Sequence, residues 1–144
     1  MNIVVHPLEE YELSIVEDLL FNNDLPIDDI YEPNIRFLVA KANDKLIGTI
    51  AIEKYDQFGL LRSLVVEKEY RNEKIGERLI NHLLISDFSV GITDLYLLTT
   101  TAKEYFVKFG FREVNRIEVP IELRQTNEFV ELCPETAIVM HKKI

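Results

Sequence analysis

The sequence predicts an α/β domain, in which a mixed β-sheet carries helices on both faces. Three short apolar segments, 35–41, 45–55 and 58–67, follow one another with tight turns between them, which is typical of an antiparallel meander. After residue 70 the apolar spacing changes from that of a strand to that of a helix, and another apolar strand follows at 94–99. A strand, a helix and a second strand in this order predict a parallel pair with a right-handed crossover.

The other elements follow from periodicity and from the residues that end them. Apolar positions recur every three to four residues in 8–20, 75–88 and 102–109, so these segments are predicted to be helices. Gly91 and Gly110 follow the second and third of them and are suitable helix ends. The remaining segments are predicted as strands at 2–6, 111–119 and 136–142, and as a surface helix or an ordered loop at 121–132.

Composition indicates one domain and excludes several classes of function. The 144 residues include 16 Lys and Arg against 25 Asp and Glu, which gives a formal net charge of -9. Such an acidic surface repels nucleic-acid backbones and anionic lipid. The sequence shows no apolar run long enough to span a bilayer and no signal peptide at its start. We therefore expect a single domain over residues 1–144 in the cytoplasm, a monomer or a homodimer, that binds neither nucleic acid nor membrane.

Metal ligands are scarce in this sequence. The chain has one cysteine, Cys133, which excludes an internal disulfide and a zinc site built from cysteines. The three histidines share no ligand spacing, so we expect no metal site. Cys133 could take an acyl group or a soft ligand such as arsenic. Its neighbours Leu132 and Pro134 favour a small buried apolar residue instead.

The loop that joins the meander to the central helix has the features of an anion site. Unpaired N–H groups and the positive end of the helix dipole attract anions to a helix N-terminus. Arg71 and Lys74 add positive charge there in an otherwise acidic chain, and Gly76 allows a ligand to approach closely. Glu73 and Glu77 could instead satisfy the dipole themselves. From these residues alone, an anion site and an ordinary helix N-terminus both remain open.

The same loop reads Arg71-Asn72-Glu73-Lys74-Ile75-Gly76. This resembles the pyrophosphate-binding loop of the GNAT superfamily of acyl-CoA-dependent N-acyltransferases, whose form is Arg/Gln-x-x-Gly-x-Gly/Ala. The two agree at Arg71 and Gly76, whereas Lys74 stands where the family has its first glycine. Segment 102–111 is similar to the family element Ala-x-x-x-Tyr-x-x-x-Gly-Phe, and the predicted order of elements agrees over nearly the whole chain. The resemblance implies a GNAT-type fold, a mixed and mostly antiparallel sheet with a central, splayed pair of parallel strands.

Segments 59–64, 95–102 and 132–137 are also similar to the GNAT branch that is encoded with arsenic-resistance operons. This resemblance implies an N-acetyltransferase with acetyl-CoA as cosubstrate. Such an enzyme acetylates the primary amine of a small, amino-acid-like acceptor by direct attack. Two other functions remain open: a catalytically weak GNAT-like module that binds or senses an acyl-CoA, and an interaction protein that uses the fold as a scaffold.

The family resemblance also implies which residues meet the coenzyme. The strand before the loop exposes main-chain groups of Leu64 and Val66 to the pantetheine arm, and the N–H of Val66 could polarise the thioester carbonyl. The residues alone indicate only ordinary core positions of a central strand. The expected coenzyme-binding set is Leu64, Val65, Val66, Arg71, Asn72, Glu73, Lys74, Ile75, Gly76, Glu77 and Phe106.

Two charged residues interrupt apolar strands. Glu53 ends the apolar run 46–52, and a partly buried carboxylate with a raised pKa can deprotonate an ammonium group. The alternative is a solvated glutamate at a strand end. Arg62 lies in mid-strand, in phase with Leu60 and Leu64, so its charge requires a partner. That partner is either Glu53 or the carboxylate of an acceptor.

A general acid is missing from the usual place. In the family a tyrosine protonates the thiolate of the coenzyme, and Phe106 stands at that position here. We expect Thr100 to orient a water molecule instead, which makes it a candidate catalytic residue together with Glu53. GNAT proteins often cover the acceptor pocket with their C-terminal segment. The expected acceptor contacts are Arg62, Thr99 and Arg124.

Overall fold

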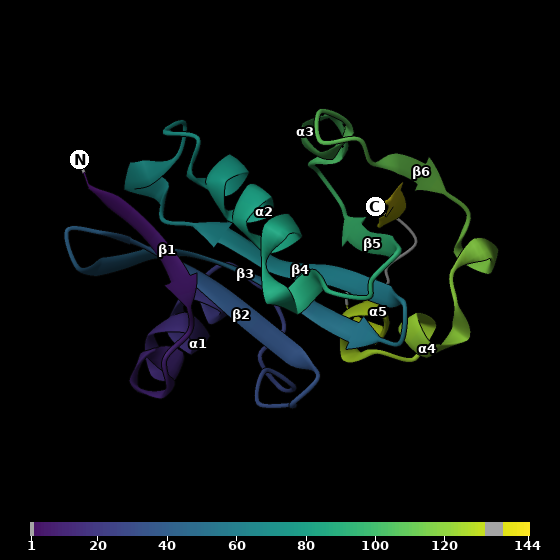
Figure 1. Ribbon diagram of the computed structural model, residues 1–144, viewed down its shortest axis with the longest axis horizontal. Helices are drawn as coiled ribbons and strands as arrows, with labels where there is room; N and C mark the ends of the chain where they lie inside the picture. The colour runs from purple at the N-terminus through teal and green to yellow at the C-terminus, as the bar shows by residue number, and fades with distance from the viewer. Residues whose placement is uncertain (1, 132–136) are drawn as a thin grey trace. The chain divides into compact units, whose positions relative to one another are not determined.

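The computed structural model describes residues 2–131 and 137–144 (Figure 1). The predictions for Cys133 and for the segment 132–136 fall outside these residues. The helices are α1 (Leu13–Phe21), α2 (Ile75–Ile85), α3 (Lys103–Val107), α4 (Ile121–Arg124) and α5 (Asn127–Glu131). The strands are β1 (Ile3–Pro7), β2 (Ile35–Ala42), β3 (Lys45–Tyr55), β4 (Phe58–Val66), β5 (Asp94–Thr99), β6 (Arg112–Val114) and β7 (Ile138–Lys143). None of the helices in this part of the chain has the length and apolarity needed to span a membrane.

The strands pair in the order β1-β2-β3-β4-β5-β7-β6. β4 and β5 run parallel, with Phe58 opposite Asp94, and α2 lies between them along the chain. The pairs β1–β2, β5–β7 and β6–β7 are antiparallel. The predicted fold class, a mixed and mostly antiparallel sheet that contains a parallel strand pair, is confirmed.

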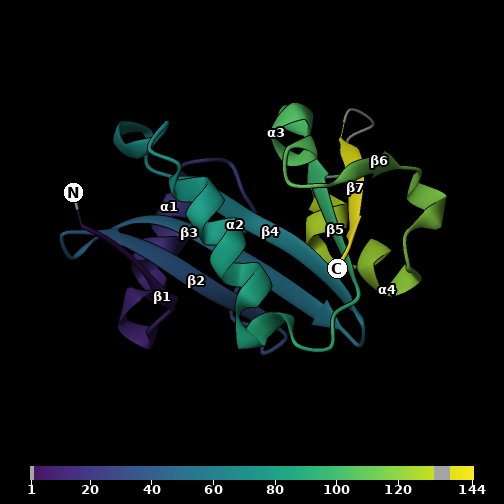
Figure 2. The same ribbon diagram turned by 45° about the horizontal axis from the view of Figure 1, so that its top comes forward.

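The chain forms two compact units, Met1–Ile52 with Ser63–Val90 and Glu53–Arg62 with Gly91–Ile144. In the first unit, Val16, Leu19 and Leu20 of α1 pack against strand residues such as Phe37 and Val39. Figure 2 shows α2 in front of the strands of this unit and α1 behind them. The apolar face of α2 is buried as well. Two of the three helices predicted from the spacing of apolar residues, α1 and α2, therefore cover this part of the sheet.

Gly48 in β3 lets α2 lie close to the strands. An added Cβ would lie 3.1 Å from the carbonyl oxygen of Val65 and 3.3 Å from Cδ1 of Leu79. Both separations are tighter than ordinary van der Waals contact. The missing side chain therefore helps to set the distance between α2 and the end of β4, where the coenzyme loop is predicted.

The core of the second unit includes residues from two helices, α4 and α5, in a segment that the sequence patterns predict to lie at the surface. Leu123 of α4 and Phe129 of α5 are buried with Leu60, Tyr96 and other apolar residues of the strands. The prediction of a surface helix or an ordered loop at 121–132 is therefore correct in that most of the described part is helical, and wrong in that one side of these helices is buried. The polar composition of this segment did not indicate that each of its two short helices buries one large apolar side chain.

Three predicted boundaries are also corrected. The strand predicted at 111–119 ends at Val114, because Asn115 begins a 3₁₀ turn in which its N–H donates to Glu118 at 3.1 Å. The helix predicted at 75–88 ends at Ile85, where the Ser86 hydroxyl donates to the carbonyl of Leu83 at 2.8 Å. The helix predicted from residue 8 starts as a 3₁₀ turn, Glu10–Glu12, before α1.

Gly110, which follows α3, provides a prediction about stability. Its φ is 91°, and an added Cβ would lie 2.8 Å from Nζ of Lys142. That Nζ donates to the carbonyl of Phe109 at 2.6 Å. Gly110→Ala is expected to lower the free energy of unfolding by about 2 kcal/mol, because backbone strain adds to the disturbance of this hydrogen bond. Urea unfolding measures the change.

Gly91→Ala is the matched control for this substitution. Gly91 has a similar φ of 83°, but the nearest atom to an added Cβ is Nζ of Lys54 at 3.5 Å. Only the backbone strain remains, about 1 kcal/mol. Equal losses of stability in the two variants would show that the contact with Lys142 contributes nothing.

Candidate active site

The end of β4 presents main-chain groups that its neighbour β3 does not use. The N–H of Glu67 donates to the carbonyl of Ile47 in β3 at 2.7 Å. Because backbone groups of successive residues point to opposite edges of a strand, the N–H and C=O of Val66 point away from β3. Within β4, Ser63 has a φ of 59°, a conformation that is uncommon for a non-glycine residue and that interrupts a regular strand.

Arg71 contacts the carbonyl group of Val66. Its Nε donates to that oxygen at 2.9 Å, and its Nη2 donates to Oδ1 of Asn23 at 3.3 Å. The side chain is otherwise exposed. The residue predicted to bind the diphosphate therefore lies against the end of the strand predicted to bind pantetheine.

The N-terminus of α2 follows this loop directly. Its N-cap residue is Lys74, which has a φ of 60° and provides no capping hydrogen bond from its side chain. Asn72 is also left-handed, with a φ of 71°. Lys74 thus adopts the backbone conformation that glycine adopts at no steric cost, at the position where the family has glycine. Within the predicted loop, the exposed residues are Arg71, Asn72, Glu73, Lys74 and Glu77.

Other members of the predicted coenzyme-binding set have side chains in the core. Val65 packs in the core cluster that contains α1, and Ile75 is 2% exposed. Phe106 is also buried, with its ring centroid 5.9 Å from that of Phe111 and 5.3 Å from that of Tyr105. A coenzyme role for Val65 and Ile75 can therefore involve only their main-chain atoms.

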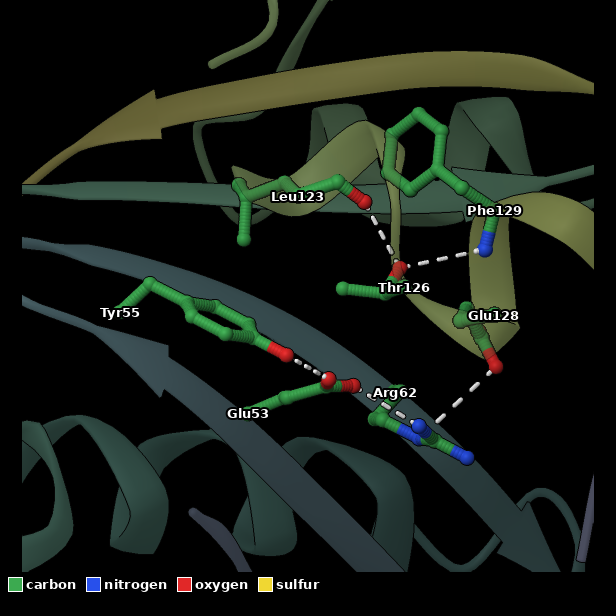
Figure 3. A network of polar contacts seen from close by, with 7 residues as sticks. All are labelled: Glu53, Tyr55, Arg62, Leu123, Thr126, Glu128 and Phe129. Carbon is green, nitrogen blue, oxygen red and sulfur yellow. Dashed lines mark hydrogen bonds and ion pairs between the residues drawn. The ribbon is translucent and has the colours of Figure 1, made fainter. Parts of the chain in front are cut away.

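In the second unit, a buried ionic network joins β3, β4 and α5 (Figure 3). Nη1 of Arg62 donates to Oε1 of Glu53 at 2.8 Å, and Tyr55 donates its hydroxyl hydrogen to Oε2 of the same carboxylate at 2.5 Å. Nε of Arg62 lies 3.8 Å from Oε1 of Glu128. The side chain of Arg62 has no exposed surface, and the two glutamates are almost as deeply buried. Hydrogen-bond donors on both oxygens are what a buried carboxylate requires.

This network decides between alternatives that the residues left open. Glu53 is 3% exposed, so the solvated glutamate at a strand end is wrong. Arg62 is paired with Glu53, the first of the two partners considered for it. Contact between Arg62 and an acceptor carboxylate stays a prediction.

Tyr55 and Glu128 were missed by the sequence analysis. Tyr55 lies two residues after Glu53 on the same strand, so period-2 alternation places both on one face, and this spacing was the available signal. Glu128 had no comparable signal, because its burial depends on how α5 packs. Thr126 supports that helix: its hydroxyl donates to the carbonyl of Leu123 at 2.7 Å and accepts the N–H of Phe129 at 3.3 Å (Figure 3).

The remaining predicted residues lie outside this network. Thr99 closes β5, and its Oγ1 accepts the N–H of Ala102 at 3.0 Å. Thr100 is exposed in the turn that follows. Arg124 is exposed at the end of α4, next to the buried Leu123. The structure therefore brings Arg62 and Glu53 together and does not join either threonine or Arg124 to them.

A second polar cluster links β5 to β7. Asp94 accepts a hydrogen bond from the hydroxyl of Thr93 at 2.7 Å, and its other oxygen lies 2.8 Å from Nε2 of His141. These two contacts hold the pKa of Asp94 below its ordinary value. Over residues 2–131 and 137–144, there is no group of three or more His, Cys, Asp or Glu side chains placed to hold a metal ion.

The strand order and the loop at the start of α2 are those of the GNAT fold, which defines the class of protein. A family model described as an acetyltransferase (GNAT) domain matches residues 33–113, which is more than half of the chain. The chain therefore belongs to the GNAT acetyltransferase domain family.

Known proteins similar to this chain are acetyltransferases. An amino-acid acetyltransferase of Neisseria meningitidis is 27% identical over 86 residues, which cover 58% of this chain and 20% of that protein. An uncharacterized N-acetyltransferase of Chlorobaculum tepidum is 28% identical over 95 residues, 65% of this chain and 61% of that protein.

A solved structure shares the fold over nearly all of this chain. It is the N-acetylglutamate synthase of Neisseria gonorrhoeae in complex with coenzyme A and N-acetyl-glutamate. The TM-score is 0.84 at 17% identity, over 99% of this chain and 35% of that one. This chain thus spans less than two thirds of the length of each of the three proteins.

Proposed function

We propose that this chain transfers the acetyl group of acetyl-CoA to the primary amine of a small, amino-acid-like acceptor. The observation that carries the proposal is the loop between β4 and α2, where Arg71 lies against the Val66 carbonyl immediately before a helix N-terminus. Membership of the GNAT family and the likeness to an amino-acid acetyltransferase support it.

The coenzyme would be held by main-chain and basic groups of the first unit. Its diphosphate would accept hydrogen bonds from N–H groups of the first turn of α2 and from Arg71 and Lys74. Its pantetheine arm would lie along the edge of β4 that points away from β3, at Leu64 and Val66. The N–H of Val66 points away from β3, which supports the proposal that it polarises the thioester carbonyl.

In the transfer step, the neutral amine nitrogen attacks the thioester carbonyl carbon, and a C–N bond forms. The C–S bond breaks to release coenzyme A as a thiolate, and the surplus proton on the nitrogen passes through water to that thiolate. We assign to Glu53 the removal of one proton from the acceptor ammonium group, directly or through water. We assign to Thr100 the positioning of the water molecule that protonates the thiolate. Phe106 has no proton to give. A thiolate leaves without an acid near neutral pH, because the pKa of a thiol is about 8.5.

The acceptor is proposed to carry a carboxylate, with Arg62, Thr99 and Arg124 as its contacts. The resemblance to the branch encoded with arsenic-resistance operons supports an amino-acid-like compound, including phosphinothricin-type and arsenical amino acids. The alternative function is an acyl-CoA-binding or -sensing module with weak catalysis. Two features favour it: the strained lysine at position 74 and the phenylalanine at position 106.

Release of thiol from acetyl-CoA tests the proposal. The assay uses a panel of amino acids, phosphinothricin, an arsenical amino acid, peptides with free N-termini, and amines that lack a carboxylate. We expect turnover of about 1 s⁻¹ or more with at least one amino-acid-like compound. Tight binding of coenzyme A without turnover would favour the binding module, and no binding would leave only the scaffold function. Turnover with peptides alone would indicate that the acceptor is the N-terminus of a protein and not a small amino-acid-like compound.

A further inference from the structure

Asn23 lies on a rigid corner at the end of α1. The N–H of Leu25 donates to the carbonyl of Leu20 at 3.0 Å, and the N–H of Asp24 donates to that of Phe21 at 3.1 Å. Asp24 has a φ of 60°. This pair of bonds around a left-handed residue is the Schellman motif, which ends a helix in a defined backbone conformation. The position of Asn23 relative to α1 is therefore fixed by main-chain bonds.

The side chain of Asn23 is oriented by a second bond. Its Nδ2 donates to the carbonyl of Leu19 at 2.8 Å, so its amide oxygen faces away from the helix. That oxygen accepts the hydrogen bond from Nη2 of Arg71 at 3.3 Å. The amide thus connects a carbonyl at the C-terminal end of α1 to the guanidinium, and the negative end of the α1 dipole favours a cation at this place.

Arg71 is consequently held at two points that belong to different elements. Nε donates to the carbonyl of Val66 at the end of β4, and Nη2 donates to Asn23 after α1. A guanidinium carries five N–H groups in a planar, rigid arrangement. With two of them used by these contacts, the direction of the other three is set by the same plane.

We propose that Asn23 is a positioning residue of the coenzyme site, which holds the Arg71 guanidinium so that its remaining N–H groups are directed to the diphosphate. The inference rests on the proposed function, because it needs a diphosphate ligand at the start of α2. Asn23 itself makes no contact with the coenzyme in this proposal. It acts through Arg71 and lowers the entropy that the long arginine side chain loses on binding.

A double-mutant cycle tests the proposal. The variants are Asn23→Ala, Arg71→Ala and the combination of both, with Asn22→Ala as the matched control, since Asn22 is the exposed neighbouring residue of the same type. Calorimetry measures the Kd for coenzyme A, and kinetics measure kcat/KM with acetyl-pantetheine, which lacks the diphosphate. Thermal unfolding shows that each variant is folded.

We expect Asn23→Ala to weaken coenzyme A binding about three- to tenfold, without a change in kcat/KM for acetyl-pantetheine. In the Arg71→Ala background the same substitution is expected to have no further effect. Asn22→Ala is expected to bind coenzyme A as the wild type does.

Three results would overturn the inference alone: an unchanged Kd in Asn23→Ala, additive effects in the double variant, or equal losses with coenzyme A and acetyl-pantetheine. A wild-type protein that does not bind coenzyme A would overturn the proposed function, and this inference with it.

Discussion

Arg62→Met is expected to destabilise the protein by about 3–5 kcal/mol, because it leaves buried carboxylates without their cation. Glu53 accepts a hydrogen bond from Arg62 at 2.8 Å, and Glu128 lies 3.8 Å from its Nε. Methionine has a similar length and no charge, so the change removes the ion pairs and largely keeps the volume. The measurement is urea unfolding at neutral pH.

Arg36→Met is the matched control for this substitution. Arg36 is exposed, with its guanidinium carbon 4.2 Å from the centre of the Phe88 ring. An exposed cation–π contact contributes only about 0.5–1 kcal/mol. Losses of similar size in the two variants would contradict the buried network as a source of stability.

A triple variant separates the loss of a cation from the loss of packing. When Glu53 and Glu128 are replaced by methionine together with Arg62, the three charged side chains that form the described ion pairs are all removed. Replacement of a complete buried ionic cluster by apolar residues is often neutral or stabilising. We expect the triple variant to regain most of the stability that Arg62→Met loses, and failure to regain it would indicate that shape, not charge, determines the cost.

The same single variant tests the proposed acceptor. If Arg62 contacts an acceptor carboxylate, Arg62→Met raises KM for a carboxylate-bearing acceptor far more than KM for acetyl-CoA. This is measured under conditions in which the variant is folded. Equal effects on both KM values would make Arg62 purely structural.

Arg71→Ala is expected to weaken coenzyme A binding about tenfold to a hundredfold, since hydrogen bonds between charged groups are among the strong ones. The free energy of unfolding is expected to change by only about 1 kcal/mol or less, because Arg71 is exposed and its partners remain accessible to water. Calorimetry with coenzyme A and urea unfolding provide the two measurements.

Arg78→Ala is the control for Arg71. Arg78 is also exposed and donates to a main-chain carbonyl, that of Ile3 at 3.0 Å, but it lies on the second turn of α2 and not in the loop. We expect its coenzyme affinity to stay within about twofold of the wild type. An unchanged Kd in Arg71→Ala would remove the loop from the proposed site.

Local patterns were sufficient for much of the fold. The hairpin turn at Asn43 and Asp44 was predicted from residue type, and both residues are left-handed, with φ of 50° and 72°. The positions of α2 and β5 followed from the change in apolar spacing. These features depend on interactions between residues that are close in sequence, so a single chain is enough to reveal them.

Packing between segments that are distant in the sequence could not be predicted from such local patterns. The burial of Phe129 depends on strands that lie far from it in the sequence, and its polar neighbours predicted a surface position. Likewise, Glu128 meets Arg62 across 66 positions of the chain (128 − 62), and no periodicity links them. The contact of Arg71 with Asn23 joins residues 48 positions apart.

By itself, the sequence determined the order of strands and helices, the parallel strand pair and the basic loop before α2, because periodicity, turn residues and charge are local properties. Only the tertiary structure decided that Glu53 is buried and paired with Arg62, and that Asn23 holds Arg71. The energy of a buried charge depends on which groups surround it in space, and that environment exists only after the chain has folded.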